Sequence, residues 1–545
     1  MLKINKLRDW GLVLSILGGL IATKSLFEKG IHPTHDGEYH VLRFQQFFKV
    51  LSEGNLYPRW APDFNNGFGT PLFSYVYPLP NYVASALHLL GFSFIDAFKL
   101  NMILATLTGA IFFYLWAKQY WGKMGGLVSS TFYTFSSYHL MDIYVRGSVG
   151  EVWSLGIFPV LLWSYLRFFE TKKKIFLTAS CFSFALVIFS HNILAVMFLL
   201  FFLSYAIFLI ISSSNKKKEL IGLFLIIVIG FGISSPFWLP ALFEINYVRG
   251  LQIFDPTGNF PDIYQLIIPS WGYGLSPSDL LNPMSVQIGI ANLIAFLLSI
   301  VVLIFSKDKK ILTFFIISFL VVFFLMTSWS IFVWRNIPLF SYFQFPWRFL
   351  SLEILIASFL SGALVSCIKN RKIKIISSIL LIILVIGLSS GYSKGATYYK
   401  RDDSYYLKRA NFTDGTNSPG NLFNTKWLDS IPQKAQSKFE FIKGAGSIDA
   451  IDLKASSYKL KVVADSDSKI LVNTAFFPGW IYILDGKKYK VENFKGKILI
   501  DIPKGTYAVD VFLANTFVQN ISYIYLLLSF LLLFSIVRKT DIIKK

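Results

Sequence analysis

Two carboxylates and three histidines fall within nine residues, between His32 and His40, directly after the first apolar segment of the chain. Carboxylates and histidines are the side chains that most often move protons in enzymes. A group of them placed where an apolar helix ends is therefore a candidate site for chemistry. Asp36 and Glu38 are the predicted catalytic pair, and His35 immediately precedes them.

The composition of the chain is that of a membrane protein. The 545 residues are 54% hydrophobic and 15% charged, with a mean hydropathy of +0.55, whereas a soluble domain is about 25% charged. Stretches such as 220–239 and 373–388 approach the roughly 20 apolar residues that cross a bilayer. The formal charge of +21 comes from Lys and Arg in short runs between apolar segments. That distribution favours orientation in a membrane over nucleic-acid binding.

Twelve apolar segments are predicted to span the membrane. The Lys- and Arg-rich loops between them all fall on one side, which is the positive-inside pattern and places both termini in the cytoplasm. The further apolar stretch 78–90 would invert every later loop if it crossed, so we expect a re-entrant or interfacial helix on the outside. The predicted spans are 10–26, 95–117, 124–140, 149–168, 175–190, 192–212, 219–240, 287–305, 311–328, 347–368, 373–391 and 520–537.

The chain is predicted to have three parts. Residues 1–391 form a multispan membrane domain with outer loops over 27–94 and 241–286. Residues 392–519 are polar, with short alternating runs and glycine turns, and predict an extracytoplasmic β-sandwich. Residues 520–545 form the last span and a basic cytoplasmic tail. The predicted fold is a mainly α, multi-pass plasma-membrane protein of about 12 transmembrane helices with this C-terminal β-domain.

Asp36 has two readings that depend on the helix after it. Apolar residues recur three and four positions apart over 38–53, with Arg43 among the polar positions. This pattern predicts an amphipathic helix lying on the membrane surface. Asp36 at its start is an N-cap, a catalytic carboxylate, or both.

Other polar clusters fall at the outer ends of the predicted spans. Arg146 and Glu151 lie in one outer loop, His191 in a tight outer turn, and Arg348 just inside a span. Taken singly, they fit an ion pair, a turn and a snorkelling arginine. Their shared side of the membrane with Asp36 predicts one site.

A Pro-, Gly- and aromatic-rich part of the first outer loop contains Arg59, Trp60 and Tyr75, and Trp347 precedes Arg348. Aromatic rings beside polar groups suit a sugar or a lipid headgroup, and Trp60, Tyr75 and Trp347 are the predicted stacking residues. An interfacial aromatic belt explains the same composition. The cytoplasmic loops contain no nucleotide-binding motif, so we expect outer-face chemistry without a nucleotide cofactor.

Several of these motifs together resemble a known family. The chain resembles bacterial and archaeal multispan proteins described as 6-pyruvoyl-tetrahydropterin synthase-related, and is similar more broadly to YfhO-like proteins and the GT-C glycosyltransferase superfamily. The resemblance covers nearly the whole chain, although the architecture of a soluble, zinc-binding pterin synthase is not reproduced. The motifs are 35–38, 57–60, Gly67/Gly69/Pro71, 146–151, 191–192, 344–348 and 477–486.

The resemblance implies a membrane glycosyltransferase. GT-C enzymes carry an acidic residue in the first outer loop, which Asp36 matches, and take a sugar from a polyprenyl-phosphate donor. The acceptor would be an envelope glycan, lipid or protein. In this reading Asp36 is the base, and His35 with Asp36 and Glu38 could also bind a divalent ion. The expected donor-phosphate or substrate contacts are His35, Arg59, Arg146, Glu151, His191 and Arg348.

Two other functions remain open from the sequence. A lipid or polysaccharide transporter predicts ionisable residues near mid-span and an internal repeat, and few such charges and no obvious repeat occur. A non-catalytic envelope-assembly protein would use its β-domain for binding and would tolerate loss of Asp36.

Overall fold

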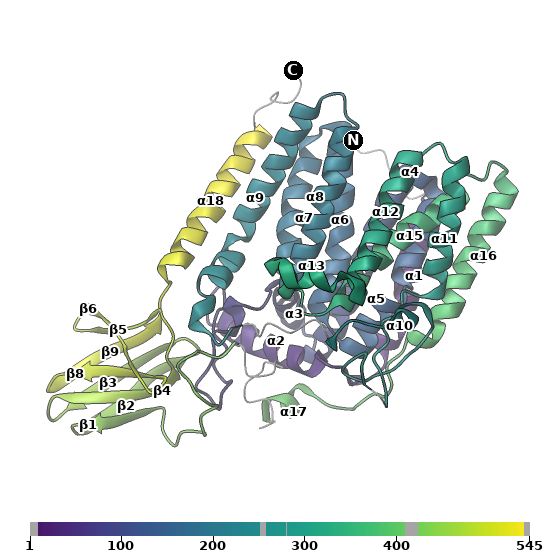
Figure 1. Cartoon of the computed structure of the whole chain (residues 1–545). Coiled ribbons are helices and arrows are strands. Elements are labelled where there is room, and N and C mark those ends of the chain that lie inside the picture. The colour runs from purple at the N-terminus through teal and green to yellow at the C-terminus, as the bar shows by residue number, and fades with distance from the viewer. Residues whose placement is uncertain (1–8, 251–257, 280, 409–422, 539–545) are drawn as a thin grey trace.

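The computed structural model describes residues 9–250, 258–279, 281–408 and 423–538. Its main body is a bundle of long apolar helices that run side by side (Figure 1). Within the described residues, eight helices are long and apolar enough to cross a membrane, and three shorter apolar helices accompany them. The bundle helices are α1 (Trp10–Ala22), α4 (Phe94–Thr134), α6 (Val149–Thr171), α7 (Lys174–Ser190), α8 (Asn192–Ile211), α9 (Lys216–Phe243), α11 (Ile290–Phe305), α12 (Lys309–Met326), α15 (Leu350–Ser366), α16 (Arg371–Ser389) and α18 (Phe517–Arg538).

Each predicted span overlaps one of these helices, which confirms the mainly helical, multispan fold class. The second and third spans both belong to α4, whose 41 residues are interrupted only at Gly122, with φ 70° and ψ −178°. The left-handed φ is open to glycine at little cost, so the chain turns there without a separate loop.

Short helices gather at one end of the bundle, beside the β-domain (Figure 1). The segment 78–90 forms an 11-residue helix there, too short to cross a bilayer. The short helices are α2 (Gly37–Ser52), α3 (Leu79–Leu89), α5 (Ser137–Met141), α10 (Ile263–Ile267), α13 (Ile331–Asn336), α14 (Pro338–Ser341) and α17 (Asp403–Lys408).

The polar face predicted for α2 is mostly buried, whereas its contact with a membrane surface stays a prediction. Its polar residues His40, Arg43, Gln45 and Gln46 are buried together with its apolar ones. The helix is enclosed because α3, α4 and α17 all pack against it. The apolar spacing marked one contact face correctly, but it did not reveal that neighbours cover the opposite face.

The C-terminal part is an antiparallel β-sandwich, as predicted. One sheet has the order β1-β4-β8-β7 and the other β2-β3-β9-β5-β6. Alternate residues of β3, from Tyr458 to Ala464, point into the shared core. The strands are β1 (Phe439–Lys443), β2 (Gly446–Lys454), β3 (Ser457–Ala464), β4 (Ser468–Ala475), β5 (Trp480–Leu484), β6 (Lys487–Lys490), β7 (Glu492–Phe494), β8 (Lys497–Ile502) and β9 (Gly505–Leu513).

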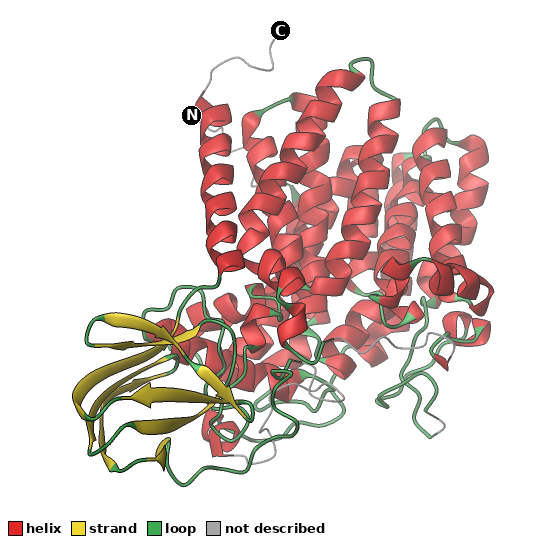
Figure 2. Cartoon of the chain, turned by 60° about the vertical axis from the view of Figure 1, so that its left-hand side comes forward, coloured by secondary structure: helices red, strands yellow, loops and turns green. Residues whose placement is uncertain are grey.

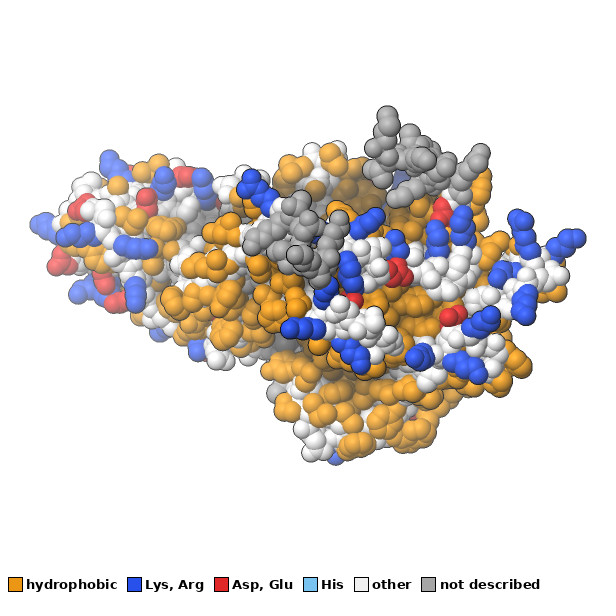
Figure 3. All heavy atoms as spheres, turned by 90° about the horizontal axis from the view of Figure 1, so that it is seen from above, with side chains coloured by type: hydrophobic (Ala, Val, Ile, Leu, Met, Phe, Trp, Pro, Cys, Tyr) orange, Lys and Arg blue, Asp and Glu red, His pale blue; other side chains and the backbone are white. Residues whose placement is uncertain are grey.

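The bundle has two distinct ends. The β-domain lies beneath the helices, joined to them through α18 (Figure 2). Lys and Arg side chains are spread over the opposite end, whereas acidic side chains are few there (Figure 3). The positive-inside rule makes the basic end cytoplasmic, and the orientation stays a prediction from that rule.

Candidate functional site

Two backbone segments are held together at the β-domain end of the bundle. The amides of His35 and Asp36 donate hydrogen bonds to the carbonyls of Val145 (3.1 Å) and Arg146 (2.9 Å). Gly147 follows with φ +62°, and a Cβ there would lie 2.2 Å from Thr34 Oγ1. Only glycine fits this close crossing, which sets the start of α2 beside the π-helical turn Asp142–Arg146.

Glu151 is the centre of a buried ionic cluster. Its carboxylate accepts two hydrogen bonds from Arg146, of which the Nη2–Oε1 contact is 2.8 Å, and one from Arg348 Nε at 3.1 Å. The Tyr138 hydroxyl donates a further one at 3.1 Å. Arg146 also donates to Asp142 at 2.7 Å. All these charged side chains are at most 8% exposed, so water screens them little.

The charge balance of the cluster depends on the protonation of Asp142. Burial and the neighbouring Glu151 raise the pKa of Asp142 well above its usual range, against the pull of Arg146. A raised pKa favours the protonated form of Asp142, and in that form Glu151 would be left to face the two guanidinium groups. Asp142 Oδ2 is buried and has no hydrogen-bond partner among the described residues. The two guanidinium groups could bind an oxygen-rich anion, and a protonated Asp142 would donate to it through this oxygen.

His191 is placed at the edge of the cluster by the start of α8. Its Nδ1 accepts from the amides of Ile193 and Leu194, both at 3.3 Å, as the N-cap of that helix. The proton consequently sits on Nε2, which lies 3.8 Å from Glu151 Oε1. Burial lowers the pKa of His191 to about 3, although Glu151 opposes the shift. His191 is thus a neutral donor.

The Trp347 ring lies against the guanidinium groups of both arginines. The guanidinium carbons of Arg146 and Arg348 lie 5.0 and 5.8 Å from its ring centre, and Phe345 stacks on it at 5.2 Å. The buried Trp347 Nε1 has no acceptor among the described residues. Arg348 is further held by the Phe343 carbonyl (3.0 Å). The cluster therefore offers a second unpartnered donor, which a substrate oxygen could meet.

Asp36 lies next to this cluster. Its backbone contacts the segment that carries Arg146, and its charge acts on nearby titratable groups. It occupies the N-cap position of α2, yet its side chain makes no capping hydrogen bond. Burial and Arg146 lower the pKa of His35, whereas Asp36 opposes them. The ring Nε2 of His35 lies 3.3 Å from the Tyr273 carbonyl, so the second outer loop reaches the site. Asp36 is half-buried at the start of α2.

Glu38 points elsewhere, toward the segment after α16. It pairs with Arg401, and the Tyr406 hydroxyl donates to it at 3.3 Å. Within the described part of the chain, no three His, Cys, Asp or Glu side chains are grouped so that they could hold a metal ion. The trio His35, Asp36 and Glu38 is therefore not assembled as an ion site in this structure.

Arg59, Trp60 and Tyr75 lie at the junction with the β-domain rather than in the cluster. Arg59 donates to Gln519, to the Ala514 carbonyl and to Asn515, at the start of α18. Trp60 is buried and meets Trp480 edge-on at 5.6 Å. Tyr75 is also buried, and its hydroxyl donates to the Glu244 carbonyl at 2.8 Å. Their roles in substrate binding stay predictions.

The structure adds residues that the sequence pattern did not single out for the site. The Tyr77 ring is tilted against the His191 ring, with 5.0 Å between ring centres. The charges of Arg43, Asp36 and Glu151 all act on its hydroxyl, although burial is the main cause of its raised pKa. Arg43 was indistinguishable from a surface residue because it occupies a polar position of α2. Its i, i+3 spacing from the buried His40 is the one available signal.

The fold and site define a multispan membrane protein with a buried cationic cluster beside a carboxylate, at the end of the bundle that carries a β-sandwich. The chain belongs to the family described as "6-pyruvoyl-tetrahydropterin synthase related domain; membrane protein", which matches residues 73–393. This confirms the family that the sequence motifs predicted.

Known relatives add little about activity. A Lactococcus lactis subsp. cremoris protein named "Uncharacterized protein" is 26% identical over 231 residues, which are 41% of this chain and 38% of that relative. The Archaeoglobus fulgidus oligosaccharyltransferase in its apo form gives a TM-score of 0.46 at 12% identity, over 76% of this chain and 59% of its own. ArnT from Cupriavidus metallidurans bound to undecaprenyl phosphate gives 0.42 at 12% identity, over 73% and 68%. TM-scores this low do not support a functional assignment.

Proposed function

We propose that this protein is a membrane glycosyltransferase that moves a sugar from a polyprenyl-phosphate donor to an envelope glycan, lipid or protein on the outer face. The observation that carries the proposal is the buried cluster in which two guanidinium groups share Glu151 and two polar atoms, Asp142 Oδ2 and Trp347 Nε1, have no partner among the described residues, beside Asp36. A phosphate is the ligand that such a cluster suits best. The resemblance of the motifs to GT-C enzymes supports the sugar and the lipid carrier.

The proposed reaction uses the two halves of the site in sequence. Asp36 accepts the proton of an acceptor hydroxyl, whose oxygen forms a bond to the anomeric carbon. The bond between that carbon and the donor phosphate oxygen breaks, and polyprenyl phosphate leaves with the electron pair. Arg146 and Arg348 stabilise the charge that develops on this phosphate, and His191 and Trp347 provide neutral donors at its edge. A single displacement of this kind inverts the anomeric configuration.

Positions of the groups support a lipid-linked donor. Arg348 is inside a candidate span, Pro346–Ser366, whereas Asp36 begins a helix outside the spans. A donor anchored in the bilayer would thus present its phosphate to the arginines from the membrane side. Under the positive-inside rule this end faces outward, away from nucleotide sugars.

The test is a transfer assay with purified protein, radiolabelled polyprenyl-phosphate hexoses and native membrane extract. Asp36→Asn is compared with Asp63→Asn, a matched change in the same loop at a half-exposed carboxylate that pairs with Lys49. We expect transfer by the wild type and Asp63→Asn and at least a hundredfold loss in folded Asp36→Asn. Equal transfer by Asp36→Asn would overturn the assignment of the base. Absence of transfer by the wild type with every donor would contradict the glycosyltransferase itself.

A further inference from the structure

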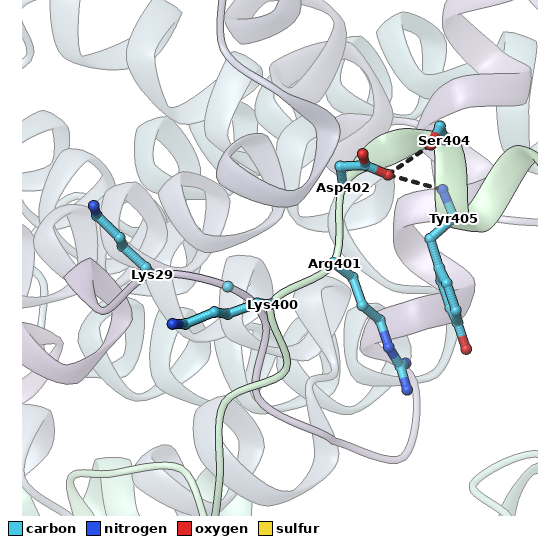
Figure 4. Close-up of a pocket in the computed structure, with 7 residues that line it drawn as sticks. Lys29, Lys400, Arg401, Asp402, Ser404 and Tyr405 are labelled. Carbon is cyan, nitrogen blue, oxygen red and sulfur yellow. Dashed lines mark hydrogen bonds between the residues drawn. The ribbon is translucent and has the colours of Figure 1, made fainter.

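A second candidate binding site lies on the same end of the molecule, outside the buried cluster. It is a surface depression of about 940 Å³ whose lining includes Lys29, Lys400, Arg401, Asp402 and Tyr405 (Figure 4). An adjoining hollow of about 560 Å³ shares part of this lining and reaches the start of α4. No lining residue of either hollow belongs to the Glu151 cluster.

The backbone holds the two lysines of the depression together. Ile31 and Tyr399 exchange two backbone hydrogen bonds of 3.0 and 2.8 Å. Gly30 has φ +93°, and a Cβ there would lie 2.3 Å from the Tyr399 carbonyl oxygen. This approach therefore requires glycine, and it fixes Lys29 beside Lys400 although 371 positions separate them (400 minus 29).

The other charges around the depression are already engaged. Arg401 pairs with Glu38 and lies between the rings of Tyr399 and Tyr405, 4.4 Å from each centre. The Asp402 carboxylate accepts hydrogen bonds from Ser404 Oγ (2.7 Å) and the Tyr405 amide (3.1 Å).

Lys29 and Lys400, by contrast, have no ion-pair partner among the described residues, and both extend toward the same side of the depression (Figure 4). Both lysines are exposed and line the same depression, so an anion bound there could contact both ammonium groups. The two lysines are therefore suited to a ligand with at least two negative charges or two anionic oxygens.

The depression lies next to the ends of two apolar helices. Lys29 follows α1 and the 3-10 turn Lys24–Phe27, and the adjoining hollow borders the first residues of the candidate span α4. Phe27 lines that hollow and is 62% exposed, as an apolar residue in contact with lipid would be. We propose that Lys29 and Lys400 bind the phosphate of a membrane-lipid headgroup. This site does not depend on the transferase proposal.

The experiment measures lipid binding to the delipidated full-length protein in neutral detergent. The probes are dioctanoyl phosphatidic acid, dioctanoyl phosphatidylcholine and inorganic phosphate. The double variant Lys29→Gln/Lys400→Gln is compared with Lys488→Gln/Lys495→Gln, which removes the same charge from exposed positions of the β-domain. We expect the first variant to bind phosphatidic acid about tenfold or more weakly and the second to match the wild type.

Equal affinity of the wild type and Lys29→Gln/Lys400→Gln for phosphatidic acid would overturn the site. Displacement of the lipid by millimolar inorganic phosphate would overturn the headgroup assignment, because free phosphate would then be the ligand. Stronger binding of phosphatidic acid than of phosphatidylcholine supports it, since the headgroup phosphate of phosphatidic acid carries more charge. Transfer activity is not a readout, so failure here and failure of the transferase are distinguishable.

Discussion

The neutral state of Asp142 can be tested through its coupling to Glu151. The raised pKa of Asp142 predicts that in the wild type Glu151 alone balances Arg146 and Arg348, while Asp142 accepts one hydrogen bond as a protonated acid. Asp142→Asn should therefore lower the free energy of unfolding by less than about 1 kcal/mol, because an amide keeps the shape and the acceptor oxygen of the acid. Glu151→Gln leaves two buried guanidinium groups without a carboxylate, and breaking such a pair costs about 3–5 kcal/mol.

The double variant reveals the link between the two acids. Once Glu151 is neutral, its repulsion on Asp142 disappears, and Asp142 can ionise and partly replace it. Removing both carboxylates should then cost more than the sum of the single variants, by about 1–3 kcal/mol. The free energy of unfolding of all four proteins is measured by denaturant titration in mixed micelles. Additive effects, or a cost of Asp142→Asn equal to that of Glu151→Gln, would refute a neutral Asp142.

Three further predictions concern single positions. Because the pKa of folded His191 is about 3, below the ordinary 6.5, stability is present above pH 6.5 and is lost as pH falls toward 3. His191→Asn, which keeps an N-cap acceptor, should flatten that loss when unfolding is followed between pH 7 and 4.5. Gly147→Ala should lower the free energy of unfolding by more than about 1 kcal/mol from its positive φ alone. Adding Thr34→Ala should restore only the part of this stability that is due to the 2.2 Å clash, as read by unfolding midpoints. Glu353 in α15 is fully buried, and neither of its oxygens has a partner in the described chain. Glu353→Leu should raise stability by about 1–3 kcal/mol without loss of sugar transfer, whereas loss of lipid or glycan transport in vesicles would favour the transporter reading.

Local patterns predicted the long helices and the β-domain of this protein. Apolar length predicted segments that overlap all the bundle helices, and alternation predicted the β-sandwich, because both are properties of short consecutive stretches. The burial of α2 was not predictable, since it results from α3 and α17, and α17 joins it from more than 300 positions away.

The sequence indicated which residues lie together better than it indicated their pairings, and their roles in a site stay predictions. His35, Asp36, Arg146, Glu151, His191, Trp347 and Arg348 meet at one end of the bundle, as their shared side of the membrane suggested. The sequence did not distinguish Arg59 from Arg146. In the structure, Arg59 donates hydrogen bonds to Gln519 and Asn515 at the β-domain junction. Such partners lie some 450 positions away, and no local signal identifies them.

The central claim is that Asp36, and not Glu38, is the base beside the cationic cluster. The most direct measurement compares initial rates of sugar transfer by Asp36→Asn and Glu38→Gln under the same conditions, with folding checked by unfolding midpoints. Glu38 pairs with Arg401, so Glu38→Gln should keep transfer within about tenfold of the wild type. Asp36→Asn should lose it by at least about a hundredfold. The reverse order of the two rates would contradict the account.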